Sequence, residues 1–329
     1  MHLADGFADP KVWATFDVVS GVTVAYAARK ARAIVKPEQT ASMGMAAAFI
    51  FAAQMVNFKV GPSSGHFVGA VLAGILFGPF VGTIVMAAVV VLQALFFADG
   101  GLAALGINVF NMGLVGTFLG YYVYEGLTRI LRFRAGEYVA AFAAAYLSLV
   151  TGAALLCLQL ALFQPQVSLG PLFAMMISVH LLIGLGEGAV TVGALLVVRR
   201  VMAEGTRPQP QAAAAPRVGW VVAGAIVAIA LATVGAQFAS RLPDGLEHSL
   251  AQQHVQPGHA PAALPAWWLH RFDDYQTRGL AQPAVSLGAA GLVGVMLALL
   301  LVSVAGSLLA GRSGSRLKPL PREDASKLT

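Results

Sequence analysis

Residues 67–97 read FVGAVLAGILFGPFVGTIVMAAVVVLQALFF, a run of 31 residues without a charged side chain. A helix rises 1.5 Å per residue, so an unbroken helix of this length would measure about 46 Å, whereas the hydrocarbon core of a bilayer is about 30 Å thick. Gly78 and Pro79 interrupt the run, and proline inside a helix kinks or breaks it. We therefore predict two short helices that meet at Gly78-Pro79.

The rest of the chain has the same apolar character. Of its 329 residues, 58% are apolar and 11% are charged, and the mean hydropathy is +0.75. Globular proteins average about 25% charged residues, so this chain cannot cover a surface that faces water. Membrane strands would show alternating segments of about ten residues, whereas the further apolar runs are long, as helices require. They lie at about 12–28, 40–58, 104–128, 138–163, 171–198, 218–239 and 284–310.

The positive charges predict how these helices are oriented. Sixteen of the 21 lysines and arginines fall in clusters between the apolar runs, at residues 29–36, 129–134, 199–217 and 312–327. Cytoplasmic loops are enriched in Lys and Arg, so we interpret the clusters as markers of membrane topology and not of nucleic-acid binding, despite the net charge of +6. An even number of crossings then separates neighbouring clusters, which again divides the 67–97 run in two. The prediction is an all-α integral membrane protein of the inner cell membrane, with about nine transmembrane helices, the N-terminus outside and the C-terminus cytoplasmic.

A change of composition divides the chain into two modules. Residues 201–216 are rich in proline and alanine, as linkers are. We predict a seven-helix module over 1–200, a two-helix module over 217–311 with an external loop at 240–283, and a basic cytoplasmic tail at 312–329. The single cysteine, Cys157, lies in an apolar run and is expected to fill the core. The first ten residues lack the basic start of a signal peptide, so we expect them to be retained.

Two histidines are predicted to meet on the external face. With the N-terminus outside, the first two helices go in and return, so the loop that ends at His66 emerges on the same side as Met1 and His2. The terminal amine, the peptide nitrogen and the imidazole of His2 can chelate one metal ion through fused rings, and His66 could add a fourth nitrogen. Four nitrogens in a plane suit Ni(II) or Cu(II). From the residues alone, a solvated His2 and a helix-capping His66 remain alternatives.

Four motifs, in order, resemble a known family. They are MHLADG at 1–6, the segment from Asn57-Phe58 to Ser64-Gly65-His66, Gly100-Gly101-Leu102 leading to NVFNMG at 108–113, and HLLIGLGEG at 180–188. Together they resemble the substrate-binding S component of cobalt and nickel energy-coupling-factor transporters, the CbiM/NikM family, over roughly residues 1–200. The resemblance implies that Met1 (through its amine), His2 (through its amide nitrogen and imidazole) and His66 hold the ion. SRLPDGLE at 240–247 resembles the signature of the N component, which is fused behind the M component in some nickel transporters.

The resemblance also implies an ATP-driven uptake transporter for Ni²⁺ (or Co²⁺). Its partners would be a transmembrane coupling (T) component and ATP-binding cassette ATPase subunits. The sequence contains no Gly-x-x-x-x-Gly-Lys-Ser/Thr phosphate loop, so we expect ATP hydrolysis to belong to those partners. We expect no enzyme activity in this chain and no cofactor besides the transported ion. The planar nitrogen chemistry and the fused module favour nickel.

Further polar residues support either the metal ligands or the packing of helices. Ionisable groups inside a membrane are functional candidates, and amide side chains can orient metal ligands, but a structural hydrogen bond is an open alternative for each. The candidates are Asp17, Asn108, Asn111, His180 and Glu187. Gly184 and Gly188 favour close helix contact, and Asp244 with Glu247 fits a capping box. The loop histidines are expected to be solvated: His248, His254, His259 and His270.

Two other classes of function remain open at this point. One is an intramembrane serine protease that uses Ser64 and His180, although the two residues are predicted at different depths. The other is a stand-alone metal permease coupled to an ion gradient, with Asp17 and Glu187 as its buried carboxylates.

Overall fold

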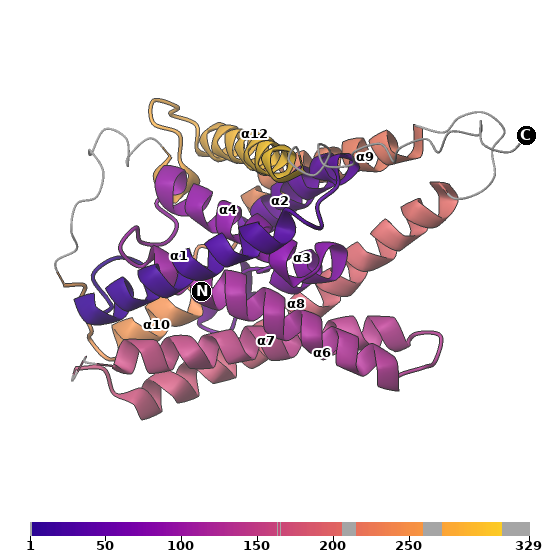
Figure 1. The fold of residues 1–329 in the computed structure, drawn as a ribbon. Helices are drawn as coiled ribbons and strands as arrows, with labels where there is room; N and C mark the ends of the chain where they lie inside the picture. Colours follow the sequence, from indigo (N-terminus) through magenta and orange to yellow (C-terminus); the bar gives the residue numbers. More distant parts are fainter. Residues whose placement is uncertain (1, 163, 165, 206–214, 259–271, 311–329) are drawn as a thin grey trace, which may run out of the picture.

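The structure is a computed structural model that describes residues 2–162, 164, 166–205, 215–258 and 272–310. It is an assembly of helices (Figure 1), and within the described ranges it contains one small β-hairpin. Met1, His259, His270, most of the predicted linker and the predicted basic tail lie outside the described residues.

The chain enters the helical assembly through α1 (Pro10–Ala31). Pro10 occupies the first helical position and Asp9 caps the helix by accepting a hydrogen bond from the backbone N–H of Lys11, both common devices at a helix start. A short 3₁₀ turn, η1 (Pro37–Gln39), leads into α2 (Thr40–Gln54), which is buried along most of its length. This helix ends at Gln54 and is therefore shorter than the predicted helix at 40–58.

A two-stranded antiparallel hairpin follows α2. Strands β1 (Phe58–Val60) and β2 (Ser63–Gly65) pair with Phe58 opposite Gly65. The hairpin is a departure from the all-α prediction, which expected a loop at these residues.

The predicted break at Gly78-Pro79 is confirmed. Helices α3 (Ala70–Phe77) and α4 (Pro79–Phe97) meet at Gly78, whose φ of +80° suits glycine. The two helices then fold back on each other so closely that an added Cβ on Gly82 would lie 2.9 Å from the backbone nitrogen of Gly74. With eight residues, α3 is about 12 Å long, so it is too short to cross a bilayer alone.

The run at 104–128 forms one helical path with an irregular middle. It consists of α5 (Leu105–Asn108), the π-helical stretch η2 (Val109–Val115) and α6 (Gly116–Ile130). The sequence predicted a helix here but not the π-helical segment.

Helices α7 (Gly136–Ala161) and α8 (Leu169–Gly205) pack along each other. Added Cβ atoms on Gly184 and Gly188 would lie 2.8 Å and 2.6 Å from ring carbons of Tyr146 and Phe142 on α7. The two glycines therefore serve close packing, as predicted. Cys157 on α7 is fully buried in the hydrophobic core, also as predicted.

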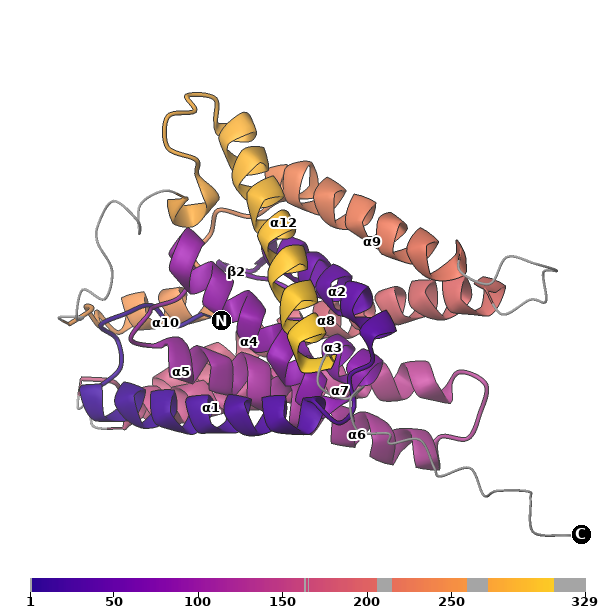
Figure 2. The same ribbon diagram turned by 45° about the horizontal axis from the view of Figure 1, so that its top comes forward.

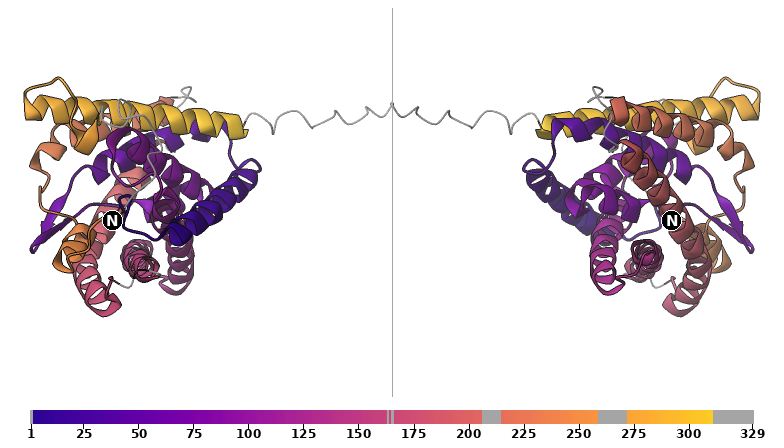
Figure 3. Two further views of the ribbon diagram at one scale, coloured as in Figure 1. Left: turned by 90° about the vertical axis from the view of Figure 1, so that its left-hand side faces the viewer. Right: turned by 90° about the vertical axis from the view of Figure 1, so that its right-hand side faces the viewer.

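The remaining elements follow the linker. They are α9 (Ala215–Thr233), η3 (Gly235–Phe238), α10 (Gly245–Gln252), η4 (Asp273–Tyr275) and α12 (Pro283–Ala310). Helices α9 and α12 pack on α2, and α10 packs on α8 (Figure 2). In the views of Figure 3, α12 lies along one edge of the molecule, and the α7–α8 pair lies towards the opposite edge.

Five helices of the described chain are long and apolar enough to cross a membrane. They are Pro79–Phe97, Gly136–Ala161, Leu169–Arg200, Val221–Phe238 and Pro283–Ala310. A crossing helix needs about 20 residues, and α2 has 15. The structure thus supports a helical membrane protein, while nine crossings and the sides on which the termini lie stay predictions.

Candidate metal centre

The segment around His2 is held against Asn108, the last residue of α5. The backbone N–H of Leu3 donates to Oδ1 of Asn108 at 2.8 Å, and Nδ2 of Asn108 donates to the carbonyl of Leu3 at 3.0 Å. That carbonyl also accepts from the backbone N–H of Gly101 at 2.8 Å. Asn108 therefore fixes the residue that follows His2, which agrees with its predicted supporting role.

The loop between α4 and α5 packs against this N-terminal segment and is hydrogen-bonded to it. Asp5 accepts hydrogen bonds from the backbone N–H groups of Leu102 and Ala104, each at 3.0 Å. Gly100 has a φ of +90°, and an added Cβ there would lie 2.9 Å from Nδ2 of Asn108 and 3.4 Å from Cβ of His2. Only glycine combines this backbone conformation with such a close approach.

His66 lies on the turn that follows β2, and Glu187 of α8 accepts hydrogen bonds from the backbone of this turn. The Glu187 carboxylate, whose residue is 2% exposed, accepts from the backbone N–H groups of Val68 at 2.6 Å and Gly69 at 2.9 Å. Nε2 of Gln54 donates to the carbonyl of Val68 at 2.7 Å. The turn that carries His66 is therefore tied to two helices by its own backbone.

His2 and His66 meet, as the sequence predicted. Their ring centroids lie 5.2 Å apart with 17° between the ring planes, and the residues are 9% and 7% exposed. Nδ1 of His66 lies 3.0 Å from the carbonyl of Phe67. A hydrogen on Nδ1 makes that contact and leaves the lone pair on Nε2, an arrangement common among metal-binding histidines. Burial, with the nearby His2 imidazole, lowers the pKa of His66 to about 3, so the ring is neutral at pH 7.

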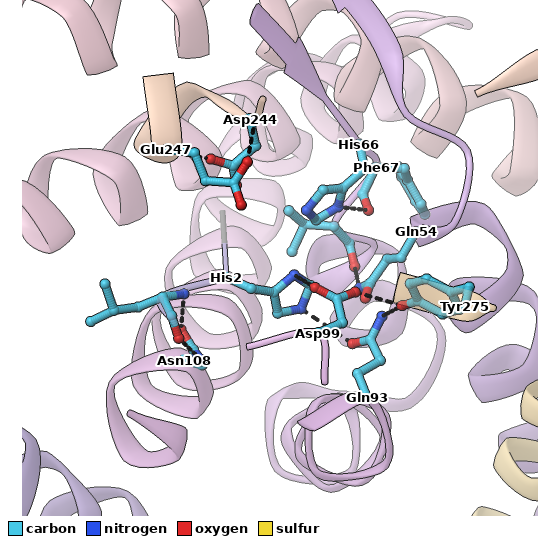
Figure 4. Close-up of polar contacts among 12 residues, drawn as sticks. His2, Gln54, His66, Phe67, Gln93, Asp99, Asn108, Asp244, Glu247 and Tyr275 are labelled. Carbon is cyan, nitrogen blue, oxygen red and sulfur yellow. Dashed lines mark hydrogen bonds and ion pairs between the residues drawn. The ribbon is translucent and has the colours of Figure 1, made fainter. Parts of the chain in front are cut away.

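Three residues that the sequence analysis missed surround the His2 ring (Figure 4). Nδ1 of His2 lies 3.0 Å from Oδ1 of Asp99, and Nε2 lies 3.2 Å from Oε1 of Gln93. The hydroxyl of Tyr275 donates to Oδ2 of Asp99 at 2.5 Å and accepts from Nε2 of Gln93 at 3.2 Å. Burial alone would raise the pKa of Asp99, but the charge and hydrogen bond of His2 and the Tyr275 hydroxyl hold it below its usual range.

Two of these three residues had a signal in the sequence. Asp99 lies two residues after the apolar run 67–97 and directly before Gly100-Gly101, and Gln93 is the one amide side chain in that run. The predicted topology places the loop after this run on the same face as His2. Tyr275 had no such signal, because its pairing with a loop 176 residues away is not encoded in any local pattern.

The second module contacts the hairpin beside this centre. The backbone N–H of Ser64 donates to the carbonyl of Pro243 at 2.9 Å, and that of Ser240 donates to the carbonyl of Asn57 at 2.7 Å. Residues 240–244 thereby lie against the β1–β2 hairpin. Asp244 and Glu247 form the predicted capping box of α10, which is confirmed.

The pairing that a serine protease would need is not formed. The hydroxyl of Ser64 donates to the carbonyl of Leu242 at 2.7 Å, and Nδ1 of His180 lies 2.7 Å from the carbonyl of Met176 on its own helix. Within the described ranges no hydrogen bond joins Ser64 to His180. A nucleophile needs a base within hydrogen-bond reach, so this geometry gives the protease hypothesis no support.

The other candidate residues join elements away from the two histidines. Asp17 accepts from the backbone N–H of Gly106 at 2.7 Å and so links α1 to α5. Asn111 and Gln159 exchange two hydrogen bonds, at 2.6 Å and 3.3 Å, between η2 and α7. Both contacts fit the structural alternative.

Two imidazoles, those of His2 and His66, lie together at this centre. Among the described residues, no group of three or more His, Cys, Asp or Glu side chains is arranged to hold a metal ion.

Comparison with known proteins agrees with this organisation. Residues 2–205 match the family model of the cobalt uptake substrate-specific transmembrane region, CbiM, and residues 218–311 match that of the PDGLE domain. A protein of Archaeoglobus fulgidus named as a fused nickel transport protein, NikMN, is 33% identical over 303 residues, which cover 92% of this chain and 96% of that protein.

Two further relatives cover the first module. A protein of Haloquadratum walsbyi named as a metal transport protein is 41% identical over 195 residues, or 59% of this chain and 87% of that one. A crystal structure described as a truncated transition metal transporter is 25% identical, with a TM-score of 0.56 over 61% of this chain and 99% of that chain. This chain therefore belongs to the CbiM family of cobalt and nickel transport membrane proteins and carries a PDGLE domain behind its CbiM region.

Proposed function

We propose that this chain is the substrate-binding subunit of a nickel or cobalt uptake transporter. It takes the divalent ion on the external face through the terminal amine of Met1, the amide nitrogen and imidazole of His2, and the imidazole of His66. The observation that supports this most is the meeting of two buried imidazoles from segments far apart in the chain, 5.2 Å between ring centroids.

The chemistry of the His2 chelate sets which ring nitrogen binds. Nδ1 closes a six-membered ring with the amide nitrogen of the same residue, whereas Nε2 points away from the backbone. In the structure Nδ1 contacts Asp99 and Nε2 contacts Gln93. We propose that the ion replaces Asp99 at Nδ1 while Gln93 keeps Nε2. A planar set of four nitrogens suits Ni(II), so nickel is the proposed substrate and cobalt the alternative.

The proposed energy source is ATP hydrolysed by other subunits. This chain has no phosphate loop of its own, and the proposed partners are a transmembrane coupling component and ATP-binding cassette ATPase subunits in the inner cell membrane. Residues 1–200 would bind the ion, with residues 217–311 as the accessory module behind the linker.

Binding of Ni(II) to the purified chain tests the ligand set. The protein must keep its native first residue, because an added residue moves the amine. We expect His66→Ala, and an N-terminal extension by one glycine, each to weaken Ni(II) binding by more than the roughly 10- to 100-fold that loss of an outer-shell partner costs. His254→Ala, in an exposed loop position, is the matched control and should bind normally. Unchanged binding in both altered proteins would refute the ligand set.

Uptake of radioactive nickel tests the energy source. Vesicles that contain this chain together with the coupling and ATPase subunits should accumulate nickel only with ATP. Uptake driven by an ion gradient in vesicles that contain this chain alone would favour the stand-alone permease instead.

A further inference from the structure

A closed ring of polar contacts surrounds the imidazole of His2, and one member comes from the second module. His2 contacts Asp99 and Gln93 through its two ring nitrogens, and both of those residues contact the hydroxyl of Tyr275. Tyr275 belongs to η4, in the segment between α10 and α12. The second module thus contacts the first module's candidate metal centre through the hydroxyl of Tyr275 (Figure 4).

Packing fixes the position of that hydroxyl. The Tyr275 ring stacks on Phe97 at the end of α4, with 5.0 Å between centroids and 22° between planes, and it lies against Phe51 of α2 at 6.0 Å. Thr277 makes hydrogen bonds to Ser286 at the start of α12, with its backbone N–H 2.6 Å from the Ser286 hydroxyl. The Tyr275 ring is therefore packed against helices of the first module, and the segment that carries it is hydrogen-bonded to α12 of the second module.

The backbone at this place adopts a costly conformation on both sides of the contact. Tyr275 has a φ of +58°, and Ala98, the residue before Asp99, has a φ of +53°. The left-handed region is unfavourable for non-glycine residues, and such residues persist where the surrounding structure demands them, often at functional sites. Two of the three such residues in the described ranges thus bring Asp99 and the Tyr275 hydroxyl together.

We propose that Tyr275 is a positioning residue of the metal site, through which the second module orients His2. The proposal rests on the proposed function. The amide nitrogen of Gln93 donates a hydrogen bond to the Tyr275 hydroxyl. The amide oxygen of Gln93 therefore faces Nε2 of His2. An N–H on Nε2 then makes that contact, and Nδ1 is presented to the ion. The same hydroxyl donates to Oδ2 of Asp99, so this carboxylate keeps a hydrogen bond when the ion takes its place at Nδ1.

The test compares Tyr275→Phe with wild type in the full chain with its native first residue. The change removes the hydroxyl and keeps the ring that stacks on Phe97. We expect Ni(II) binding, measured by competition with a chromophoric chelator, to weaken about 10-fold, the lower end of outer-shell effects. We also expect the electron paramagnetic resonance spectrum of bound Cu(II), used as a probe, to change its hyperfine splitting. Tyr122→Phe, at an exposed tyrosine of α6, should change neither.

A double-mutant cycle separates positioning from general loosening of the structure. In a Gln93→Met background the amide that links the Tyr275 hydroxyl to Nε2 of His2 is already absent, so Tyr275→Phe should weaken binding by less than about 3-fold, because contacting residues are not additive. Gln93→Met alone serves as a second variant if Tyr275→Phe does not fold. It should weaken Ni(II) binding and alter the Cu(II) spectrum in the same way.

The outcomes distinguish this inference from the proposed function. If His66→Ala loses Ni(II) binding while Tyr275→Phe binds within about 2-fold of wild type with an unchanged Cu(II) spectrum, Tyr275 does not position the site and the proposed function stands. An equal loss from Tyr275→Phe in the wild-type and Gln93→Met backgrounds would also overturn the inference. If His66→Ala binds like wild type, the proposed function itself fails.

Discussion

At the scale of single residues, Gly100 determines how closely the loop after α4 approaches His2. Its φ is +90°, and an added Cβ would contact both Asn108 and His2. Gly279 has nearly the same φ, +89°, but an added Cβ there meets nothing within 4 Å. The two glycines therefore separate the cost of backbone strain from the cost of crowding the candidate centre.

We expect Gly100→Ala and Gly279→Ala each to lower stability by about 1–2 kcal/mol, the cost of a left-handed alanine. Only Gly100→Ala should also weaken Ni(II) binding, by about 10-fold if the clash near His2 adds some 1.4 kcal/mol. Thermal unfolding in detergent and chelator competition measure the two effects. Equal Ni(II) affinities of the two variants would show that Gly100 matters only for its backbone conformation.

The residues of the candidate centre were predictable to different degrees. His2, His66 and Asn108 could be chosen because basic clusters placed their segments on one face. Asp17 and Asn111 were chosen for the same polar character, yet they join helices elsewhere. Polarity in an apolar run identifies a buried hydrogen bond but not its partner, and the partner decides the role.

At the scale of elements, α3 begins against a buried carboxylate. The first N–H groups of a helix have no partner within the helix, and the turn before α3 presents the N–H groups of Val68 and Gly69 to Glu187. This contact joins α8 to the turn that carries His66. Glu187 thus supports the start of a short helix and the position of a candidate ligand together.

We expect Glu187→Ala to lower the unfolding midpoint, because two buried N–H groups lose their acceptor at about 1–3 kcal/mol each. Glu187→Gln keeps one oxygen acceptor and should cost less. The matched control is Glu125→Ala, which removes a surface ion pair with Arg129 worth about 0–1 kcal/mol. A midpoint for Glu187→Ala equal to that of Glu125→Ala would contradict the supporting role.

The helices could be predicted from the sequence where the length of an apolar run allowed only one arrangement. A 31-residue run broken by Gly78-Pro79 had to become two helices, and it did. The β1–β2 hairpin and the π-helical stretch at Val109–Val115 were missed. The hairpin forms by backbone pairing within a predicted loop, and the π-helical stretch does not change the hydropathy of the run in which it lies.

At the scale of the whole molecule, the two modules are joined by α2 and α12. The helices approach so closely at Gly44 that an added Cβ would collide with Ser303 of α12. By contrast, an added Cβ on Gly21 of α1 would meet no atom within 4 Å. Sequence reasoning divided the chain into modules but could not find this contact, because packing between distant helices leaves no local pattern.

We expect Gly44→Leu to cost about 1–3 kcal/mol through overpacking, and Gly21→Leu to cost little beyond helix propensity. Since Thr277 ties the Tyr275 segment to α12, Gly44→Leu should also weaken Ni(II) binding, in the same direction as Tyr275→Phe. Unfolding midpoints and chelator competition check both effects. Normal Ni(II) affinity in a destabilised Gly44→Leu protein would show that α12 does not influence the centre.

The ring of contacts around His2 also has a consequence for the time at which the centre forms. During synthesis residue 2 emerges first, whereas Tyr275 emerges 176 residues after its partner Asp99. At 5–20 residues per second, that interval is about 10–35 s. Throughout it the Asp99 carboxylate beside His2 lacks the Tyr275 hydroxyl, so a newly made chain closes this ring of contacts only after translation has passed residue 275 of the second module.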